Sequence, residues 1–245
     1  MKADIFKNNK NQNKHAKRIA LKTLSPLLDC ICKIIIKSSC EEKEEKIVLG
    51  TGFFIKIYEN KYFYFLVTAN HVLKKDIMKS DKSIEITTES GKSQEFDKNS
   101  RKKRIKKYLK DLDIMAMQIF DSDEIIKQKI KFLSCSTNHE EDYSDCYEKE
   151  AFILQFPNGG DLEYASGKIM DKEKSKNRKK YEFAHSIDTE YGSSGSPLIL
   201  FEDKKVIGVH TGRFDKINFD YNIGAFIGEL YKEILKEIKD QNQNQ

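Results

Sequence analysis

Three residues with the functional groups of nucleophilic catalysis lie in separate parts of the sequence. His71 ends the segment TANH, Asp113 begins the segment DIMAM, and Ser194 lies in the segment GSSGSP. A serine hydroxyl is a poor nucleophile until a histidine removes its proton, and a carboxylate must then fix the histidine tautomer and stabilise the imidazolium. These residue types, in this order, predict a catalytic triad of His71, Asp113 and Ser194.

The segment around Ser194 also contains backbone groups that such chemistry needs. Glycine adopts backbone conformations that other residues avoid, so Gly192 allows a turn in which its N–H and that of Ser194 point at one spot. A tetrahedral oxyanion at that spot would be stabilised by both donors. We therefore predict an oxyanion hole formed by Gly192 and Ser194.

The histidine and the aspartate both have competitors. The apolar run YFYFLVT precedes His71 and makes it a strand-end residue, where catalytic groups are commonly displayed. No matching run precedes the other histidines, which are His15, His139, His185 and His210. Choosing Asp111 in place of Asp113 would force the polar Asp113 into the alternating apolar strand that follows. We therefore interpret Asp111 as a charge at the entrance of that strand.

Short runs with strand-like alternation, separated by turn residues, make up most of the sequence. In the first half they cover residues 27–36, 47–58, 62–68, 83–88, 94–96 and a run from 113. In the second half they cover residues 151–156, 164–170, 181–187, 197–201, 206–210 and 223–226. Apolar residues at helical spacing follow in 229–239. The pattern predicts an all-β fold of two antiparallel six-stranded β-barrels with a C-terminal α-helix, and an active site between the barrels.

The same pattern divides the chain into five parts. We expect a disordered or frayed tail at 1–24, because that part is rich in lysine and asparagine. A first barrel over 25–130 would carry the histidine and the aspartate, and a second barrel over 131–228 would carry the serine. A helix at 229–240 and a polar tail at 241–245 complete the expected organisation.

Three passages of the sequence resemble the chymotrypsin-fold (trypsin-like) serine proteases. They are GTGFFIKI–FLVTANHVL, DIMAMQI and YGSSGSPLIL–KVIGVHTG–YNIGAFI, and they occur in the family's order. The family pattern G-x-S-G-x-P selects Ser194, rather than Ser193 or Ser196, as the nucleophile. The form GSSGSP with a following GVH is most similar to bacterial glutamyl endopeptidases and picornaviral processing proteases, in the branch without disulfides around the active site. The resemblance implies a serine endopeptidase that cuts a polypeptide through an acyl-enzyme and needs no cofactor or metal.

The resemblance also implies which residues contact P1, the substrate residue before the cut bond. Thr189 and His210 would contact the carboxylate of a P1 glutamate or the amide of a P1 glutamine. A hydroxyl and an imidazole N–H are suitable donors for those oxygens. Arg213, near the rim, would add a charge-assisted bond to glutamate, and Gly224 would leave the pocket wall open.

Two alternatives compete with this interpretation. Asp188 lies six residues before Ser194, the spacing at which trypsin-like enzymes carry the acid that binds P1 lysine or arginine. A protease-like fold retained for protein recognition, without catalysis, is the second alternative.

The run Arg101–Lys107 is strongly basic. It would serve either as a nuclear localisation signal or anion-binding patch, or as a lysine-rich loop or edge strand that discourages edge pairing. The net charge of +5 does not demand a nucleic-acid partner, and we expect none.

The cysteines and the N-terminus bear on the compartment. Five cysteines occur, at 30, 32, 40, 135 and 146, and none flanks the predicted nucleophile, so a reducing compartment is favoured. Cys30-Ile31-Cys32 would place both thiols on one face of a strand, where buried structural roles are favoured over a metal site.

The N-terminus lacks an apolar core of signal-peptide length, and the run LLDCICKIII is too short to span a bilayer. We expect an intracellular, cytoplasmic protein without a membrane span.

Overall fold

The computed structural model describes residues 24–37, 48–136, 143–171, 179–216 and 219–243. The tail predicted for 1–24 lies outside this part except for Leu24, which is buried in the core rather than frayed. The polar tail predicted for 241–245 is described only to residue 243.

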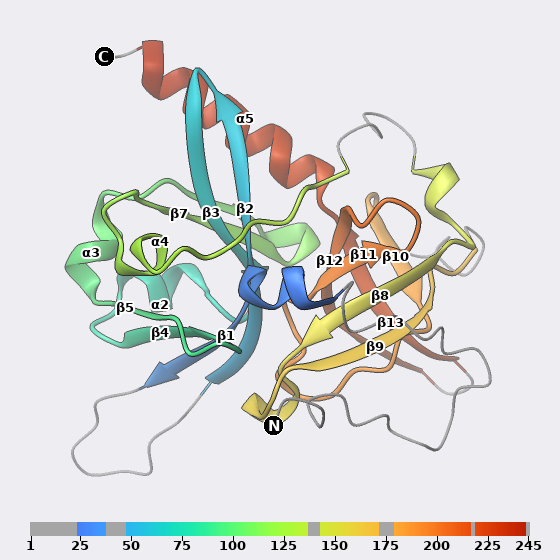
Figure 1. The fold of residues 1–245 in the computed structure, drawn as a ribbon. Helices are drawn as coiled ribbons and strands as arrows, with labels where there is room; N and C mark the ends of the chain where they lie inside the picture. Colours follow the sequence, from blue (N-terminus) through green and yellow to red (C-terminus); the bar gives the residue numbers. More distant parts are fainter. Residues whose placement is uncertain (1–23, 38–47, 137–142, 172–178, 217–218, 244–245) are drawn as a thin grey trace.

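Among the described residues, the first sheet is antiparallel and has seven strands, in the order β5-β4-β1-β2-β3-β7-β6 (Figure 1). The strands are β1 (Ile31–Lys37), β2 (Val48–Glu59), β3 (Lys61–Ala69), β4 (Ser83–Thr88), β5 (Ser93–Phe96), β6 (Lys106–Leu109) and β7 (Ile114–Ile119). In β4, Ile84 and Ile86 are buried while their neighbours are partly exposed, which is the alternation that the sequence shows. Six strands were expected, and the additional one is β6, formed by part of the basic run at the edge of the sheet.

Short helical segments connect these strands. They are η1 (Ser25–Cys30), α2 (Lys75–Lys79), α3 (Lys98–Lys102), η2 (Lys110–Leu112) and α4 (Glu124–Lys127). The strand predicted for 27–36 is wrong over its first residues, because Pro26 occupies the first turn of a 3-10 helix, where its fixed φ fits. Cys30 consequently ends a helix and packs in a different core cluster from Cys32, so the two thiols do not share a strand face.

The second sheet has six strands in the part of the chain that the structure describes, in the order β10-β13-β12-β11-β8-β9. The strands are β8 (Glu150–Gln155), β9 (Glu163–Lys168), β10 (Glu182–His185), β11 (Pro197–Leu200), β12 (Val206–Lys216) and β13 (Phe219–Phe226), with η3 (Ser144–Cys146) and η4 (Pro157–Gly159) between them. Its two edges meet, because a bridge joins Ile169 to His185 and the Met170 amide donates to the Ala184 carbonyl at 2.9 Å. This sheet is therefore a closed barrel.

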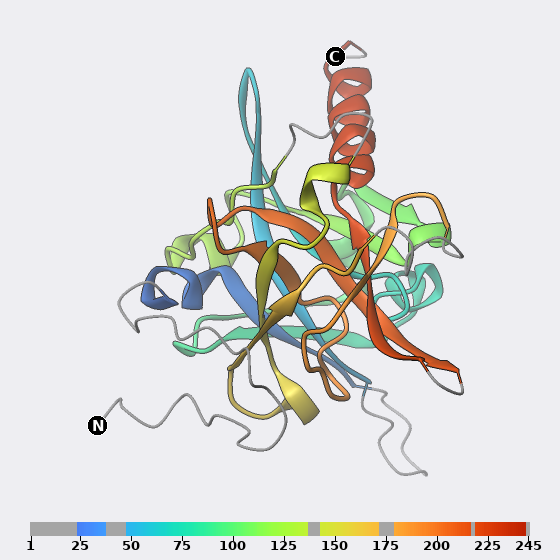
Figure 2. The same ribbon diagram turned by 90° about the vertical axis from the view of Figure 1, so that its right-hand side faces the viewer.

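The C-terminal helix α5 (Gly228–Gln243) follows the second sheet in sequence but packs against β2, β6 and β7 of the first (Figures 1 and 2). Its buried side chains Leu230, Ile234 and Ile238 follow the predicted helical spacing. Outside the apolar face, Lys107 of β6 pairs with Glu237 at 2.7 Å. No helix in the described ranges combines the length and the apolar character needed to cross a bilayer.

The largest cluster of buried apolar side chains belongs to both sheets. It contains Phe53 and Phe65 from the first sheet, Phe152 and Ile199 from the second, and Ile234 from α5. Each such side chain contributes roughly 1.5–3 kcal/mol when fully buried. This shared core fixes the two barrels relative to each other, which matters because the candidate site takes residues from both.

The basic run Arg101–Lys107 is used largely inside the fold. Arg101 is fully buried and donates to the carbonyls of Ser80, Lys82 and Phe96. Burial lowers the pKa of Arg101. The guanidinium thus binds main-chain carbonyls at and near β5, which is an edge strand of the sheet. Because it is buried and bonded in this way, Arg101 is not available to bind an anion.

Arg104 has a comparable structural role. Its guanidinium binds Asp123 through two bonds, from Nη1 to Oδ2 at 2.5 Å and from Nη2 to Oδ1 at 2.7 Å, and it lies over the rings of Phe96 and Phe120. Both charged side chains are almost completely buried. The interpretation of the run as a nuclear localisation signal or anion patch is therefore wrong for both arginines, and the edge-strand interpretation is confirmed for β6.

Removing the partner of Arg104 is expected to destabilise the protein strongly. Asp123→Ala leaves a buried guanidinium without its carboxylate, which costs roughly 3–5 kcal/mol. Asp121→Ala, which removes an exposed carboxylate two residues away, is the matched control and should change stability by less than about 0.5 kcal/mol. Urea unfolding measures both, and equal effects would contradict the structural role of the pair.

Candidate active site

The segments that carry His71 and Asp113 are neighbours because β3 and β7 are paired strands. Ala69 at the end of β3 lies opposite Ile114 at the start of β7. The Asn70 amide donates to the Asp113 carbonyl at 2.8 Å. The turn after β3 thus continues directly beside the residue that precedes β7.

His71 binds both carboxylate oxygens of Asp113. Its Nδ1 lies 2.5 Å from Oδ2, and its backbone N–H donates to Oδ1 at 2.9 Å. Asp113 has a left-handed backbone (φ 54°), which terminates η2 and turns the carboxylate toward the histidine. With Nδ1 bound to a carboxylate, the ring keeps Nε2 available as a base.

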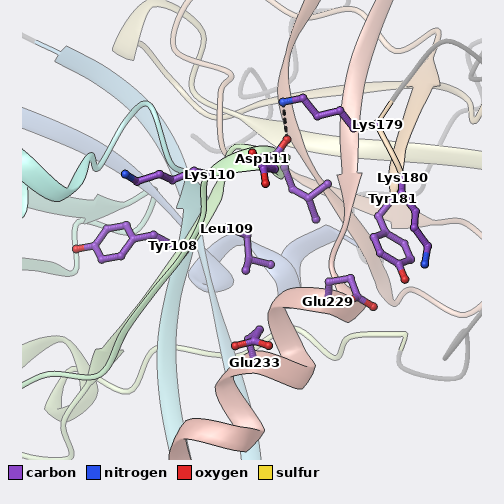
Figure 3. A pocket seen from close by; sticks show the side chains of 10 residues that line it. Tyr108, Leu109, Lys110, Asp111, Lys179, Lys180, Tyr181, Glu229 and Glu233 are labelled. Carbon is purple, nitrogen blue, oxygen red and sulfur yellow. Dashed lines mark hydrogen bonds between the residues drawn. The ribbon is translucent and has the colours of Figure 1, made fainter.

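Asp111, the competing acid, is placed elsewhere. It is exposed, and its carbonyl accepts a bond from Lys179 Nζ at 2.7 Å. It lines a pocket of about 660 Å³ between β6, η2, residues 179–181 and α5, where Glu229 and Glu233 also lie (Figure 3). None of the residues predicted for catalysis or substrate binding lines this pocket.

The segment with Ser194 lies against the strands that lead to His71. The Ser194 carbonyl accepts from the Thr51 amide at 2.9 Å, and the Gly195 amide donates to the His210 carbonyl at 2.8 Å. Gly195 has φ 93° and no room for a side chain, because a Cβ would collide with the Thr51 carbonyl and the Thr68 hydroxyl. The close approach places the serine segment at the end of β3, at the junction of the barrels.

The backbone N–H groups of Gly192 and Ser194 are directed away from the protein's own acceptors. The Tyr191 carbonyl accepts from the Asn158 amide at 2.5 Å, and the Ser193 carbonyl accepts from the Ser196 amide and hydroxyl at 3.0 and 2.7 Å. In a trans peptide the N–H points opposite to the C=O, so the N–H groups of Gly192 and Ser194 point the other way. Within the described ranges, neither N–H donates to a protein acceptor. Both are thus free to bind a substrate oxygen.

The residues predicted to contact P1 differ in their surroundings. His210 is buried and Thr189 is half-buried, whereas Asp188 and Arg213 are exposed. Gly224 lies opposite His210 on the neighbouring strand.

Packing gives a reason for a glycine at 224. A Cβ there would come within 2.6 Å of the Phe183 ring and 2.7 Å of Leu198. Gly224 is therefore required by packing inside the second barrel, and the expectation that it keeps a pocket wall open stays a prediction.

His185 is a neighbour of His210 that sequence reasoning passed over. Its Nε2 lies 3.2 Å from His210 Nδ1, and both rings are buried. The Ile187 amide donates to His185 Nδ1 at 3.4 Å, which places the His185 proton on Nε2. In this tautomer His185 can donate to His210 Nδ1, and the Ile223 carbonyl is a further acceptor for the pair.

Burial keeps both histidines neutral. Desolvation, together with the nearby His71, lowers the pKa of His210 to about 4. Desolvation and the neighbouring His210 lower the pKa of His185 well below its usual value. At neutral pH both imidazoles are therefore uncharged, and they interact with each other and with their surroundings through hydrogen bonds.

These two barrels, with the candidate residues at their junction, form a chymotrypsin-like fold. Residues 50–209 match the trypsin-like peptidase domain, and the chain belongs to that family. The structure is similar to the crystal structure of tobacco vein mottling virus protease, with a TM-score of 0.53 and 14% sequence identity over 88% of this chain and 83% of that chain. No curated protein sequence matches the chain. The likeness to the glutamyl endopeptidase branch stays a prediction.

Acidification is expected to destabilise the protein through the histidine pair. The unfolded chain binds these protons near pH 6.5, while folded His210 resists protonation until about pH 4. The contribution of the histidine pair to the free energy of unfolding is therefore fully present above pH 6.5. It is lost as the pH falls toward 4, by about 3 kcal/mol for His210 alone.

Denaturant unfolding at pH 7 and pH 4.5 checks this expectation. The double variant His185→Gln/His210→Gln lacks both titrating rings but keeps every carboxylate, so its stability should change less between the two pH values. An equal change in both proteins would rule out the pair as the origin of the acid sensitivity.

Proposed function

We propose that the protein is a serine endopeptidase that uses His71, Asp113 and Ser194 as its catalytic triad. The observation that carries the proposal is the pairing of His71 Nδ1 with Asp113 Oδ2 at 2.5 Å, reinforced by the bond from the His71 amide to the other carboxylate oxygen. This arrangement holds the imidazole in the tautomer and orientation that a general base requires. The contacts of Gly195 with the end of β3 support a position of Ser194 beside that base.

The proposed reaction follows from these groups. His71 Nε2 removes the proton from Ser194 Oγ, which attacks the carbonyl carbon of the cut peptide bond. The N–H groups of Gly192 and Ser194 stabilise the oxyanion, and Asp113 stabilises the imidazolium. His71 then protonates the leaving amine, and a water molecule activated by the same ring hydrolyses the acyl-enzyme.

The preferred substrate in this proposal has glutamine or glutamate at P1, with glutamine favoured at neutral pH. The proposal assigns the His210 proton to Nε2, where it can be donated to the substrate while Nδ1 accepts from His185 Nε2, 3.2 Å away. A buried neutral imidazole can bind an amide oxygen, but it does not compensate the charge of a buried carboxylate. Arg213, at an exposed position, would compensate a P1 glutamate only weakly because water screens its charge.

Ser194→Ala is expected to abolish labelling by a fluorophosphonate probe and nearly all peptide hydrolysis, since it removes the nucleophile. Asp113→Asn should fold normally and reduce kcat by on the order of 10⁴, because the histidine tautomer is no longer enforced.

The control is Asp111→Asn, which neutralises an exposed carboxylate two residues away and should leave kcat unchanged. Turnover that persists in Ser194→Ala would refute the assignment. A loss confined to Asp111→Asn would transfer the acid role to Asp111.

A peptide library with varied P1 residue should show cleavage after glutamine first and glutamate second. His210→Ala should lower kcat/KM for the P1 glutamine substrate by roughly 10²-fold, since a buried amide is left without its donor. Probe labelling of Ser194 should change little, because the nucleophile is untouched. A preference for P1 lysine or arginine would assign the pocket to Asp188 and leave the triad unaffected.

A further inference from the structure

The side chain of Thr51 lies fully buried between the two barrels, in β2 of the first. Its hydroxyl donates to the Gly192 carbonyl at 2.9 Å and accepts from the Phe156 amide at 3.0 Å. Both partners belong to the second half of the chain. One hydroxyl therefore joins a strand of the first barrel to two separate segments of the second.

The main chain of Thr51 is fixed as well. Its amide donates to the Ser194 carbonyl at 2.9 Å, and its carbonyl accepts from the Thr68 hydroxyl at 2.7 Å. The residue cannot shift without breaking bonds to the nucleophile segment and to the strand before His71. The hydroxyl is thus a rigidly placed anchor.

The two partners of the hydroxyl act on one residue, Gly192. The Gly192 carbonyl is bound directly by Thr51. The Phe156 amide, also bound by Thr51, begins the turn whose Asn158 amide holds the Tyr191 carbonyl. That carbonyl is the other end of the peptide unit that contains the Gly192 N–H. The hydroxyl is therefore bonded to one of the two peptide units beside the Gly192 Cα and is linked to the other through the turn that begins at Phe156.

Such control is needed because of the conformation of Gly192. Its φ of 91° is open to glycine, which has no side chain to restrict rotation of the adjacent peptide units. Its orientation consequently depends on the groups that bind its neighbouring carbonyls. Without the Thr51 hydroxyl, the Gly192 carbonyl would be buried without a donor, and rotation to find one would turn the peptide.

We infer that Thr51 is a positioning residue of the oxyanion hole, whose hydroxyl holds Gly192 with its N–H toward the substrate carbonyl oxygen. The inference rests on the proposed function and adds to it a residue that touches neither the substrate nor the triad side chains. The effect is expected in the transition state, where charge develops on that oxygen, and not in substrate binding.

The test compares Thr51→Val, which removes the hydroxyl with little change of shape, with Thr51→Ser, which keeps it. Removing an oxyanion donor outright costs about 10²–10³ in kcat, so misplacing one should lower kcat by about 10–10². In Thr51→Val, KM should stay within about threefold, and Thr51→Ser should restore most of kcat. Thr88→Val, which removes another buried hydroxyl in β4, is the stability control and should keep its kcat.

A second readout separates positioning from a general loss of stability. A peptidyl trifluoromethyl ketone forms a hemiketal oxyanion with the serine, so its affinity should fall in Thr51→Val by the same factor as kcat. Binding of the corresponding uncleaved peptide, measured in a Ser194→Ala background with and without Thr51→Val, should not change. Should Thr51→Val fail to fold, Thr51→Ala, which also removes the hydroxyl, takes its place in both measurements.

Wild-type kcat and ketone affinity in folded Thr51→Val, or in Thr51→Ala where it takes its place, would overturn the inference, even if the unfolding free energy were reduced. Equal losses of ketone and peptide binding would overturn it too, because they indicate a distorted substrate site. Failure of the proposed function has a different signature, namely hydrolysis that persists in Ser194→Ala.

Discussion

The contact of β2 with the serine segment is the constraint on which the rest of the candidate site depends. The proposed base and acid belong to the first barrel and the proposed nucleophile to the second, so their geometry exists only while the barrels are held in one arrangement. The bond from the Thr51 amide to the Ser194 carbonyl and the close fit of Gly195 provide that arrangement. Because a displacement of about 1 Å can cost on the order of 10²-fold in rate, a loose interface would not suffice.

Much of the fold could be predicted because strand formation leaves a local record in the sequence. Residues such as Ile84 and Ile86 alternate with polar neighbours, and this period of two appears wherever one face of a strand is buried. The helix α5 was equally visible in the spacing of Leu230, Ile234 and Ile238. The meeting of His71 with Asp113 followed from residue types at the ends of two such strands, together with family resemblance.

What could not be predicted depends on contacts between distant segments. His185 meets His210 because β13 lies between β10 and β12 in the sheet, and no local pattern encodes that order. Thr51 was noted only as part of a predicted strand and of a passage that resembles the family. The prediction of a localisation signal or anion-binding patch in the basic run was wrong at its arginines for a related reason. The sequence shows the charge of Arg101 but not the carbonyl groups that bind it. One error had a local cause. Pro26 favours a helical turn, so the first residues of the strand predicted for 27–36 form a 3-10 helix.

The position of α5 has a consequence for the order in which the protein can form during synthesis. The first barrel emerges from the ribosome early, yet Leu230, Ile234 and Ile238 of its covering helix are translated only after the entire second barrel. Its core therefore remains incomplete, with apolar surface uncovered, until the second barrel has been made. Contacts of such long sequence separation slow folding and make the two barrels cooperative partners rather than units that mature one after the other.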